Sequence, residues 1–470
     1  MIERLRRITR TAARLGIVAF VAIACQPSTQ TPAPRSRSSA APHVLVFSDL
    51  HFNPFADPAV VDSLARADVA RWPAILSSSK QQAFSQYGSD TNYPLMTSAL
   101  AAMRSAEPTP EVILFAGDFL AHNFQFAYRK VAHDTSAGAL AAFTAKTNQF
   151  IVQQIAAAFP GVQVLPALGN NDSSCGDYMS EPGSGFLRAF AESWRPLVSP
   201  RGSPVDFVGS FSRAGHFSAY VPSIGIRVIV MNDVYWSPRY SNACGSLADN
   251  PGRDALGWLE QTLMFSRQRN EEVWLLMHVP VGMDVYATLR TDTLVSMIDP
   301  KYATPLISLL RRYGSTVRFV IAGHTHMNEF RVISDVDGTP LLGSQQIPSV
   351  STNVGTNPAF AVMSVDSASG NITDYTVHSL TNLASASTTT PGRWSKEYDF
   401  REVFGLDGLS STTLATMQAA LQADTTLRAR YINFFDSGSA RANVSSSWRA
   451  YWCGIDMIDR VAFDRCYRRP

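Results

Sequence analysis

The sequence predicts an α/β fold, a sandwich of two β-sheets flanked by helices, followed by a small helical C-terminal subdomain. Short apolar, β-branched runs alternate with helical patterns along most of the 470 residues, and this alternation is typical of α/β proteins. After residue 326, four short strand-like runs separated by turn residues suit a second, more antiparallel sheet. From residue 396 onward the pattern becomes helical.

Five of the apolar runs end in polar residues of the kinds that bind metals. The runs cover residues 44–51, 112–118, 162–172, 273–278 and 317–326. Ligands of an open α/β sheet bind outside the carboxyl ends of its strands. One such residue is commonly structural, but five strand ends of this kind indicate a shared crevice. The side chains expected to face it are Asp49, His51, Asp118, Asn170, His278, His324 and His326.

The last of these runs ends in Gly-His-Thr-His. Two histidines one residue apart point to the same side of an extended backbone, so His324 and His326 are expected to converge. Neutral imidazoles suit divalent transition metals.

The remaining chain predicts a catalytic domain over residues 43–382 and a helical subdomain over residues 396–470. Residues 52–95 have little apolar periodicity and predict a long loop over the site, and the polar stretch 381–395 predicts a linker. Asp254 is expected to cap a helix that runs to about Arg269. Further helices are expected at 93–105, 138–159, 186–194, 305–313, 409–423, 425–435, 441–452 and 455–467, and strands at 217–233 (two), 330–335, 340–343, 360–366 and 371–380.

These motifs resemble those of the calcineurin-like metallophosphoesterases. Asp-x-His, Gly-Asp, Gly-Asn-x-Asp, a lone His and Gly-His-x-His occur in that order over roughly residues 44–380. The segments 166–170 and 348–358, and His122 after Gly117-Asp118, are similar to the acid sphingomyelinase-like branch. The resemblance implies the four-layer metallophosphoesterase fold and a hydrolase for phosphoric ester bonds. Metal-bound hydroxide would attack phosphorus directly, without a covalent enzyme intermediate.

The resemblance also implies two divalent metal ions and their ligands. Zinc is expected, with manganese or iron as alternatives. Asp118 would bridge the ions, because one carboxylate must hold them close together. Asp49, His51 and His326 would complete the first site, and Asn170, His278 and His324 the second.

One position departs from the family pattern. Many members have Gly-Asn-His, and that histidine is their presumed proton donor, but this chain has Asn171, which cannot act as an acid at neutral pH. Similar relatives with Gly-Asn-Asn-Asp resemble endopolyphosphatases. His122 is therefore the best candidate for the acid or for a phosphate contact. Asp172 is expected to orient a histidine ligand or an adjoining loop.

The leading hypothesis is a phosphodiesterase similar to acid sphingomyelinases, acting on phosphocholine lipids, nucleotides or related diesters. A polyphosphatase or a phosphomonoesterase on the same site is the alternative that Asn171 keeps open. An envelope lipoprotein that binds phosphate ligands without turnover is a third hypothesis, which the complete ligand set disfavours.

The N-terminus predicts export. Five arginines precede the apolar stretch 15–23, and Ala22-Ile-Ala-Cys25 resembles a lipoprotein cleavage box, so residues 1–25 read as a signal peptide with Cys25 as the lipidated residue. Ordinary secretion is the alternative. Residues 26–42, rich in Pro, Ser and Thr, predict a tether. The expected location is the periplasm or outer membrane through a lipid anchor, or the medium.

Charge and cysteine count narrow the remaining possibilities. Removing residues 1–24 takes away five arginines and Glu3, so 35 basic and 37 acidic residues remain. The sequence contains no basic patch that would indicate nucleic-acid binding, and a monomer is expected.

Besides Cys25 the chain has four cysteines, which allow three pairings. Cys175–Cys244 and Cys453–Cys466 are favoured, and the second spacing resembles a C-terminal bridge of the acid sphingomyelinases.

Overall fold

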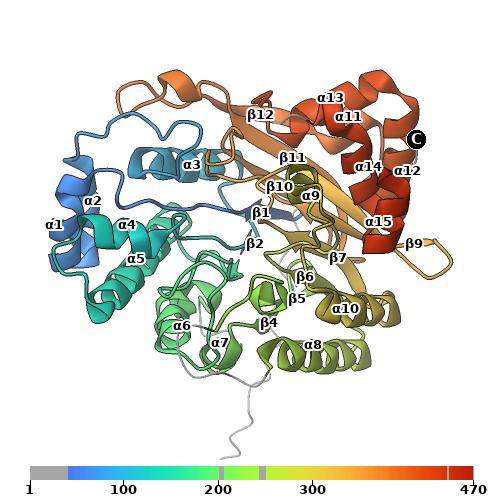
Figure 1. Ribbon diagram of the computed structural model, residues 1–470, viewed down its shortest axis with the longest axis horizontal. Coiled ribbons are helices and arrows are strands. Elements are labelled where there is room, and N and C mark those ends of the chain that lie inside the picture. The colour runs from blue at the N-terminus through green and yellow to red at the C-terminus, as the bar shows by residue number, and fades with distance from the viewer. Residues whose placement is uncertain (1–40, 201–205, 243–249, 442–443, 469–470) are drawn as a thin grey trace, which may run out of the picture. The chain divides into compact units, whose positions relative to one another are not determined.

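Two six-stranded mixed sheets form the centre of the computed structural model (Figure 1). In spatial order the first sheet contains β12 (Trp394–Asp399), β11 (Asn371–Leu380), β10 (Ala359–Asp366), β1 (His43–Phe47), β2 (Val112–Phe115) and β3 (Val164–Pro166). The second contains β4 (Phe217–Val221), β5 (Ile226–Val230), β6 (Glu272–Leu276), β7 (Val317–Ala322), β9 (Pro340–Gln346) and β8 (Glu329–Ser334). The predicted two-sheet α/β fold is confirmed.

Within each sheet, the strands that carry the site are parallel to one another. β1, β2 and β3 run in one direction in the first sheet, and β5, β6, β7 and β9 do so in the second. Because the carboxyl ends of parallel strands meet at one edge, the residues that follow them gather there.

The second sheet buries both of its faces. Trp274 and Leu276 belong to the large core cluster that also includes Val46 of the first sheet. Val273 and Leu275 belong to a second cluster, with side chains of the covering helices. Successive side chains of one strand therefore enter different cores, which is the alternation of a strand inside a sandwich.

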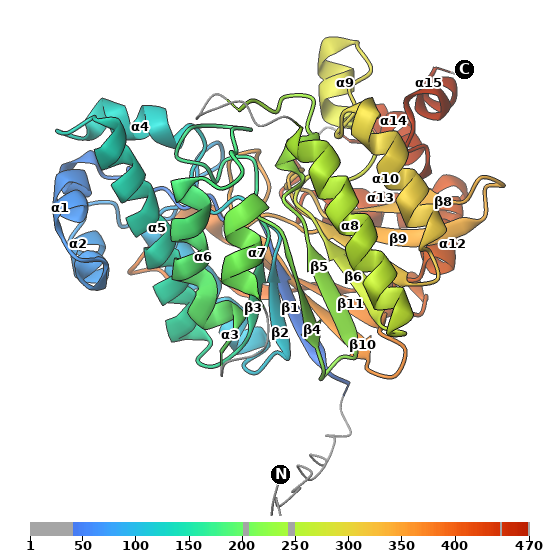
Figure 2. The same ribbon diagram turned by 90° about the horizontal axis from the view of Figure 1, so that it is seen from below.

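Helices cover the sheets. α6 (Gly185–Val198) contacts β3, and α8 (Pro251–Gln268) contacts β5 and β6. Figure 2 shows α5 (Ala137–Ala158), α6, α7 (Phe207–Ala214), α8 and α10 (Pro300–Arg312) side by side along one side of the strands. The other elements of this part are α1 (Val61–Arg66), α2 (Trp72–Ser77), α3 (Tyr93–Ala106), α4 (Phe124–Val131) and α9 (Val285–Thr291).

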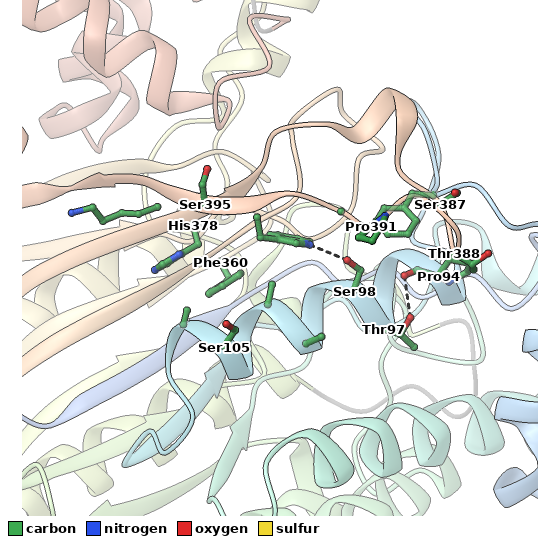
Figure 3. Close-up of a pocket in the computed structure, with 17 residues that line it drawn as sticks. Pro94, Thr97, Ser98, Ser105, Phe360, His378, Ser387, Thr388, Pro391 and Ser395 are labelled. Carbon is green, nitrogen blue, oxygen red and sulfur yellow. Dashed lines mark hydrogen bonds between the residues drawn. The ribbon is translucent and has the colours of Figure 1, made fainter.

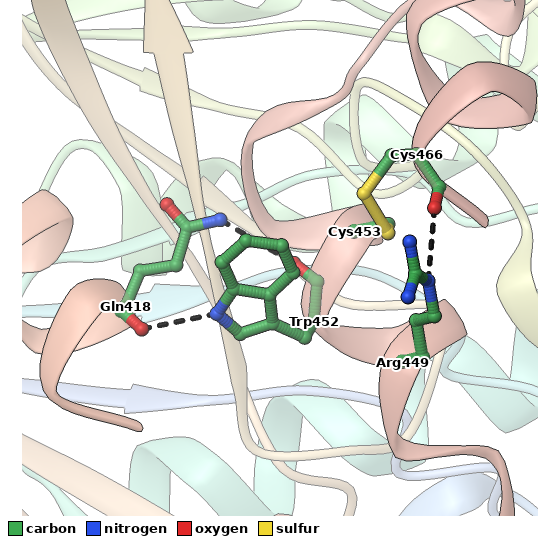
Figure 4. Close-up of a disulfide and its surroundings, with 5 residues drawn as sticks. All are labelled: Gln418, Arg449, Trp452, Cys453 and Cys466. Atoms are coloured by element: carbon green, nitrogen blue, oxygen red, sulfur yellow. Dashed lines mark hydrogen bonds between the residues drawn. A yellow bond between two sulfur atoms is a disulfide. The ribbon is translucent and has the colours of Figure 1, made fainter. Parts of the chain in front are cut away.

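The C-terminal helices pack on both sheets, since the first of them contacts β11 and β12 and later ones contact β8 and β9. They are α11 (Phe400–Phe404), α12 (Ser411–Ala423), α13 (Thr425–Phe435), α14 (Trp448–Asp456) and α15 (Arg460–Tyr467). α12 contacts β8 and β9, and α14 contacts β8 and α9. The predicted Cys453–Cys466 disulfide joins α14 to α15, with Cα atoms 5.9 Å apart (Figure 4). Cys175 is disulfide-bonded, but Cys244 lies outside the described residues, so their pairing stays a prediction.

Several predicted boundaries differ from the structure. Residues 52–95 contain α1 and α2 and are not one long loop. The chain after residue 394 does not begin as a helix, because β12 pairs with β11 at the edge of the first sheet. The four strands after residue 326 do not form one sheet, since β8 and β9 join the second sheet and β10 and β11 the first. Asn250, not Asp254, caps α8.

The structure describes residues 41–200, 206–242, 250–441 and 444–468, which belong to one unit. The predicted signal peptide, Cys25 and nearly all of the predicted tether lie outside these residues. Within them, no helix is both long and apolar enough to cross a membrane.

Candidate metal centre

The seven residues predicted to face one crevice follow five strands at the same edge of the two sheets. Asp49 and His51 follow β1, Asp118 follows β2, and Asn170 follows β3. His278 follows β6 in the second sheet, and His324 and His326 follow β7. Six of the seven side chains belong to buried residues, and His324 is partly buried. The structure therefore brings together residues that are up to 277 positions apart.

The backbone at these residues is unusual. Five of them have positive φ angles: 51° at Asp49, 44° at His51, 58° at Asp118, 72° at His324 and 63° at His326. Non-glycine residues rarely adopt this left-handed conformation, and it costs about 1–3 kcal/mol where it persists at functional sites. The expectation of an extended backbone at His324 and His326 is therefore wrong. The ring of His324 instead lies 5.1 Å from that of His278, and the ring of His326 lies 5.0 Å from that of His51.

The side chains form two groups that share one carboxylate. In the first group, His326 Nε2 lies 3.4 Å from Asp49 Oδ1 and 3.2 Å from His51 Nε2. In the second, His278 Nε2 lies 3.0 Å from Asn170 Oδ1. Asp118 Oδ2 lies between the groups, 3.3 Å from His51 Nε2 and 3.4 Å from His278 Nε2.

Backbone carbonyls fix how two of the imidazoles are protonated. His51 Nδ1 donates to the Leu120 carbonyl at 2.9 Å, and His278 Nδ1 donates to the Ala116 carbonyl at 2.7 Å. A carbonyl can only accept, so in each neutral ring Nδ1 carries the hydrogen and Nε2 offers a lone pair to the site.

These atoms fit a cation better than they fit each other. In the neutral rings, the lone pair of His51 Nε2 faces His326 Nε2, and that of His278 Nε2 faces the Asn170 amide oxygen. Burial alone would lower the pKa of His51 and of His278, but the Asp118 carboxylate raises them to about 9 and about 10. Positive charge is therefore stabilised at the His51 and His278 rings, and the donor set of carboxylate, amide oxygen and imidazole suits divalent transition metals. Within the described residues, two sets of side chains have donor atoms close enough to share one ion: His51, His122 and His326 form one, and Asp49, Asp118 and His278 form the other.

The other two histidines are held neutral. Burial lowers the pKa of His324 to about 3 and that of His326 to about 4. A neutral imidazole is the form that binds metals, so neither residue has to lose a proton first.

Glycines allow the strand ends to approach each other. A Cβ at Gly323 would overlap Ser48 Oγ and lie 2.8 Å from Asp49 Oδ2. A Cβ at Gly169 would overlap the Asp118 side chain. The Gly-His and Gly-Asn steps are therefore required by close packing of the metal-facing segments.

Asn171 and Asp172 form hydrogen bonds that hold Asp118 and the adjoining loops in place. Asn171 donates from its backbone N–H to Asp118 Oδ1 and from Nδ2 to Asp118 Oδ2, both at 2.8 Å. Asp172 accepts from the backbone N–H groups of Gly169, Asp118, Phe119 and Leu120, at 2.6–3.2 Å. Of the two alternatives for Asp172, the structure favours the adjoining loop.

His122 lies at the rim of the first group. Its ring stacks on His51 at 3.9 Å, and its side chain is 31% exposed. Asp90 accepts from His122 Nδ1 and from its backbone N–H, both at 2.8 Å. Of the two ring nitrogens, Nε2 is therefore the one that could contact a substrate. Asp90 was not predicted as a site residue, because it lies in a stretch without a periodic pattern.

A cavity of about 350 Å³ opens beside His324. Two tyrosines and two arginines line it, and none was predicted: Tyr178, Tyr286, Arg239 and Arg290. Tyr286 is 65% exposed. Tyr178 and Arg239 reach the cavity from loops, and Tyr286 and Arg290 reach it from α9; such contacts leave no pattern in a sequence.

A larger cavity, of about 840 Å³, lies between α3 and strands β10–β12 (Figure 3). Trp394 donates to Ser98 Oγ there, and His378 stacks on Phe360. None of the seven candidate ligands lines this cavity, so it is separate from the site.

The chain is similar in sequence to known phosphoesterases. Residues 42–328 match the family model of calcineurin-like phosphoesterases. Sphingomyelinase phosphodiesterase D of Dictyostelium discoideum is 25% identical over 359 residues, which cover 75% of each chain. Cyclic GMP-AMP phosphodiesterase SMPDL3A of Mus musculus is 26% identical over 462 residues, covering 96% of this chain and 97% of that protein.

Among solved structures, a dimetal phosphatase from Danio rerio matches 72% of this chain and 95% of its own, with 12% identity and a TM-score of 0.42. The family model covers more than half of the chain and includes all seven candidate metal ligands. This chain belongs to the calcineurin-like phosphoesterase family.

Proposed function

We propose that the chain is an exported phosphodiesterase that uses two divalent metal ions and prefers nucleotide-like diesters. Asp49, His51 and His326 would hold the first ion, Asn170, His278 and His324 the second, and Asp118 both. The observation that carries this assignment is the position of Asp118 Oδ2, 3.3 and 3.4 Å from a histidine nitrogen of each group. Zinc suits these donors, and manganese or iron is compatible with them.

The two ions would supply Lewis-acid charge neutralisation at the phosphate and a nucleophilic water at moderate pH. The protein's own contribution is orientation. Asn171 holds both oxygens of Asp118, and Asp172 ties the two glycine-containing loops together through four backbone N–H groups. These contacts set the distance between the two halves of the site before substrate arrives.

His122 is the proton donor in this proposal. Asn171 cannot serve, because an amide does not titrate and both of its donors already point at Asp118. The Asp90 carboxylate fixes His122 Nδ1 as the protonated nitrogen and orients the ring beside His51. When both ring nitrogens carry a hydrogen, Nε2–H can give its proton to the leaving oxygen while Nδ1–H stays hydrogen-bonded to Asp90.

The cavity beside His324 supports a nucleotide over a choline headgroup. Arg239 lies 4.3 Å from the Tyr178 ring centroid and Arg290 lies 5.8 Å from that of Tyr286. Choline is a cation and is recognised by aromatic cages, so two arginines disfavour it, although Asp284 also lines the cavity. Bases stack on tyrosine and arginine planes, and arginine also binds further phosphates. One relative is a cyclic GMP-AMP phosphodiesterase by name.

Export is the second part of the proposal. The Cys453–Cys466 disulfide suits an oxidising compartment. The basic and apolar stretch before Ala22-Ile-Ala-Cys25 has the character of a cleaved leader, with Cys25 as its lipidation site.

A substrate panel tests the proposal. The metal-loaded protein is assayed with a dinucleotide, a cyclic dinucleotide, sphingomyelin vesicles, p-nitrophenyl phosphate and polyphosphate. The dinucleotides should give the highest kcat/KM. Arg290→Ala should lower kcat/KM for the dinucleotides by raising KM. A preference for sphingomyelin would reject the nucleotide assignment, and a preference for p-nitrophenyl phosphate or polyphosphate would favour the monoesterase or polyphosphatase alternative.

A further inference from the structure

Asp177 lies between a candidate metal ligand and an arginine of the cavity. Asn170 Nδ2 donates to Asp177 Oδ1 at 2.7 Å, and Arg239 Nη2 donates to Asp177 Oδ2 at 2.8 Å. The two carboxylate oxygens thus have different partners, one facing the metal centre and one facing the cavity.

The first hydrogen bond determines which atom Asn170 offers to a metal. An amide has one oxygen that can act as a ligand and one NH₂ group that cannot, and the two occupy similar space. The Asp177 carboxylate only accepts, so the NH₂ group must face it. The amide oxygen is then directed toward His278, where it lies 3.0 Å from Nε2.

The neighbouring Tyr178 contacts another residue of the same group. Its hydroxyl lies 3.2 Å from His324 Nε2, and its backbone N–H donates to the Asn170 carbonyl at 2.9 Å. Tyr178 is 5% exposed, has a left-handed backbone (φ 55°) and carries the Arg239 guanidinium over its ring. Arg239 therefore contacts both Asp177 and Tyr178; Asp177 contacts Asn170, and Tyr178 contacts both His324 and Asn170.

We propose that Asp177 and Arg239 are positioning residues for the second metal ion, and that Asp177 acts by holding the amide of Asn170 with its oxygen toward the ion. The inference rests on the proposed ligand set and assigns roles to residues outside it. Asp49, His51 and His326, which would hold the first ion, make no hydrogen bond or ion pair with Asp177 or Arg239 among those of the described residues. Loss of Asp177 should therefore affect the two ions unequally.

The test is a titration of metal-free protein with Zn²⁺, read by calorimetry and by elemental analysis of the loaded chain. Partners that orient a ligand are worth about 10–100-fold in metal affinity. Asp177→Ala should weaken one of the two sites by that factor and leave the other unchanged. Asp177→Asn has one acceptor oxygen in place of two, so it can accept from Asn170 or from Arg239 but not from both, and its loss of affinity should lie between those of the wild type and Asp177→Ala. Arg239→Ala should give a smaller loss, and Arg290→Ala, which lines the same cavity, should give none.

A second background separates orientation from general damage. Asn170→Asp offers an oxygen in either orientation, so Asp177→Ala should cause no further loss of affinity in that background. An equal loss in both backgrounds would mean that Asp177 acts only structurally, and the inference would be wrong. Thermal unfolding of the metal-free variants checks that each one folds.

The wild-type titration distinguishes the two levels of the proposal. A wild-type chain that binds two ions, together with an Asp177→Ala variant that binds both with unchanged affinity, overturns the inference alone. A wild-type chain that binds no second ion overturns the proposed function and the inference with it.

Discussion

Replacing Cys453 and Cys466 together with serine should loosen the C-terminal hairpin of α14 and α15 and weaken substrate binding without removing the metals. Cys453 is buried in a small cluster with Met283, Val285 and Phe463. The next residue, Gly454, approaches Val285 so closely that a Cβ there would lie 2.7 Å from its Cγ2. The hairpin therefore supports α9 at its first residue, Val285. This helix carries Tyr286 and Arg290, which line the cavity.

The size of the effect follows from the loop that the disulfide closes. The two cysteines are 13 residues apart. In the chain-entropy model, closing a loop of this length raises the free energy of the unfolded hairpin by about 3 kcal/mol. Since 1.4 kcal/mol corresponds to a factor of ten, local opening should become roughly 100-fold more frequent. The Trp452–Gln418 hydrogen bonds still attach α14 to α12 (Figure 4), so the hairpin should open without general unfolding.

Hydrogen exchange and steady-state kinetics measure these consequences. Amides of α9, α14 and α15 should exchange faster, those of β1, β2 and β3 should not, and KM for a dinucleotide should rise with little change in metal content. Arg449→Ala is the matched control, because it removes one exposed hydrogen bond to the Cys466 carbonyl and keeps the disulfide. Equal acceleration in the strands, or an unchanged KM despite a loosened α9, would refute the proposed support of the cavity by the hairpin.

Three further changes have defined outcomes. His122→Ala should slow hydrolysis of an alkyl phosphodiester by about 10²–10⁴-fold and that of a nitrophenyl diester far less, because a good leaving group needs little protonation; equal slowing would indicate a phosphate contact instead. Burial lowers the pKa of His216 to about 4, so only the unfolded chain gains this proton between pH 6.5 and 4. The free energy of unfolding should fall by about 3 kcal/mol over that range. His216→Phe keeps an aromatic ring that can pack against Trp258 and should remove this part of the pH dependence in denaturant titrations. Gly323→Ala should cost at least one metal ion per chain, because its Cβ has no room beside Ser48; unchanged elemental analysis would contradict the tight packing.

The sequence was sufficient for the ligand positions because the signal there is local. An apolar run followed by Asp, Asn or His indicates both a strand and the residue where it ends, as at Asp49 and His278. The ends of neighbouring parallel strands then lie together at one edge of the sheet. The order of strands within each sheet was not predictable in this way. β8 and β9 have the same kind of sequence as β10 and β11, yet they join different sheets, since the choice of partner depends on distant segments.

The supporting residues that were not predicted from the sequence act through contacts between loops. Asp90 supports His122 across 32 positions, and Arg239 reaches Asp177 across 62. Both acids lie among polar turn residues, where an acidic side chain is usually solvated. β12 was missed for a related reason, because an edge strand with exposed Ser395 and Lys396 lacks the apolar alternation of an inner strand.

The most direct measurement of the central claim is the number of divalent metal ions bound by the wild-type chain and by Asp118→Ala. A carboxylate shared by two sites predicts about two ions in the wild type and the loss of both in the variant, because each site loses a ligand at once. An Asp118→Ala chain that keeps its full metal content, or loses one ion and holds the other with unchanged affinity, would contradict the shared position of Asp118.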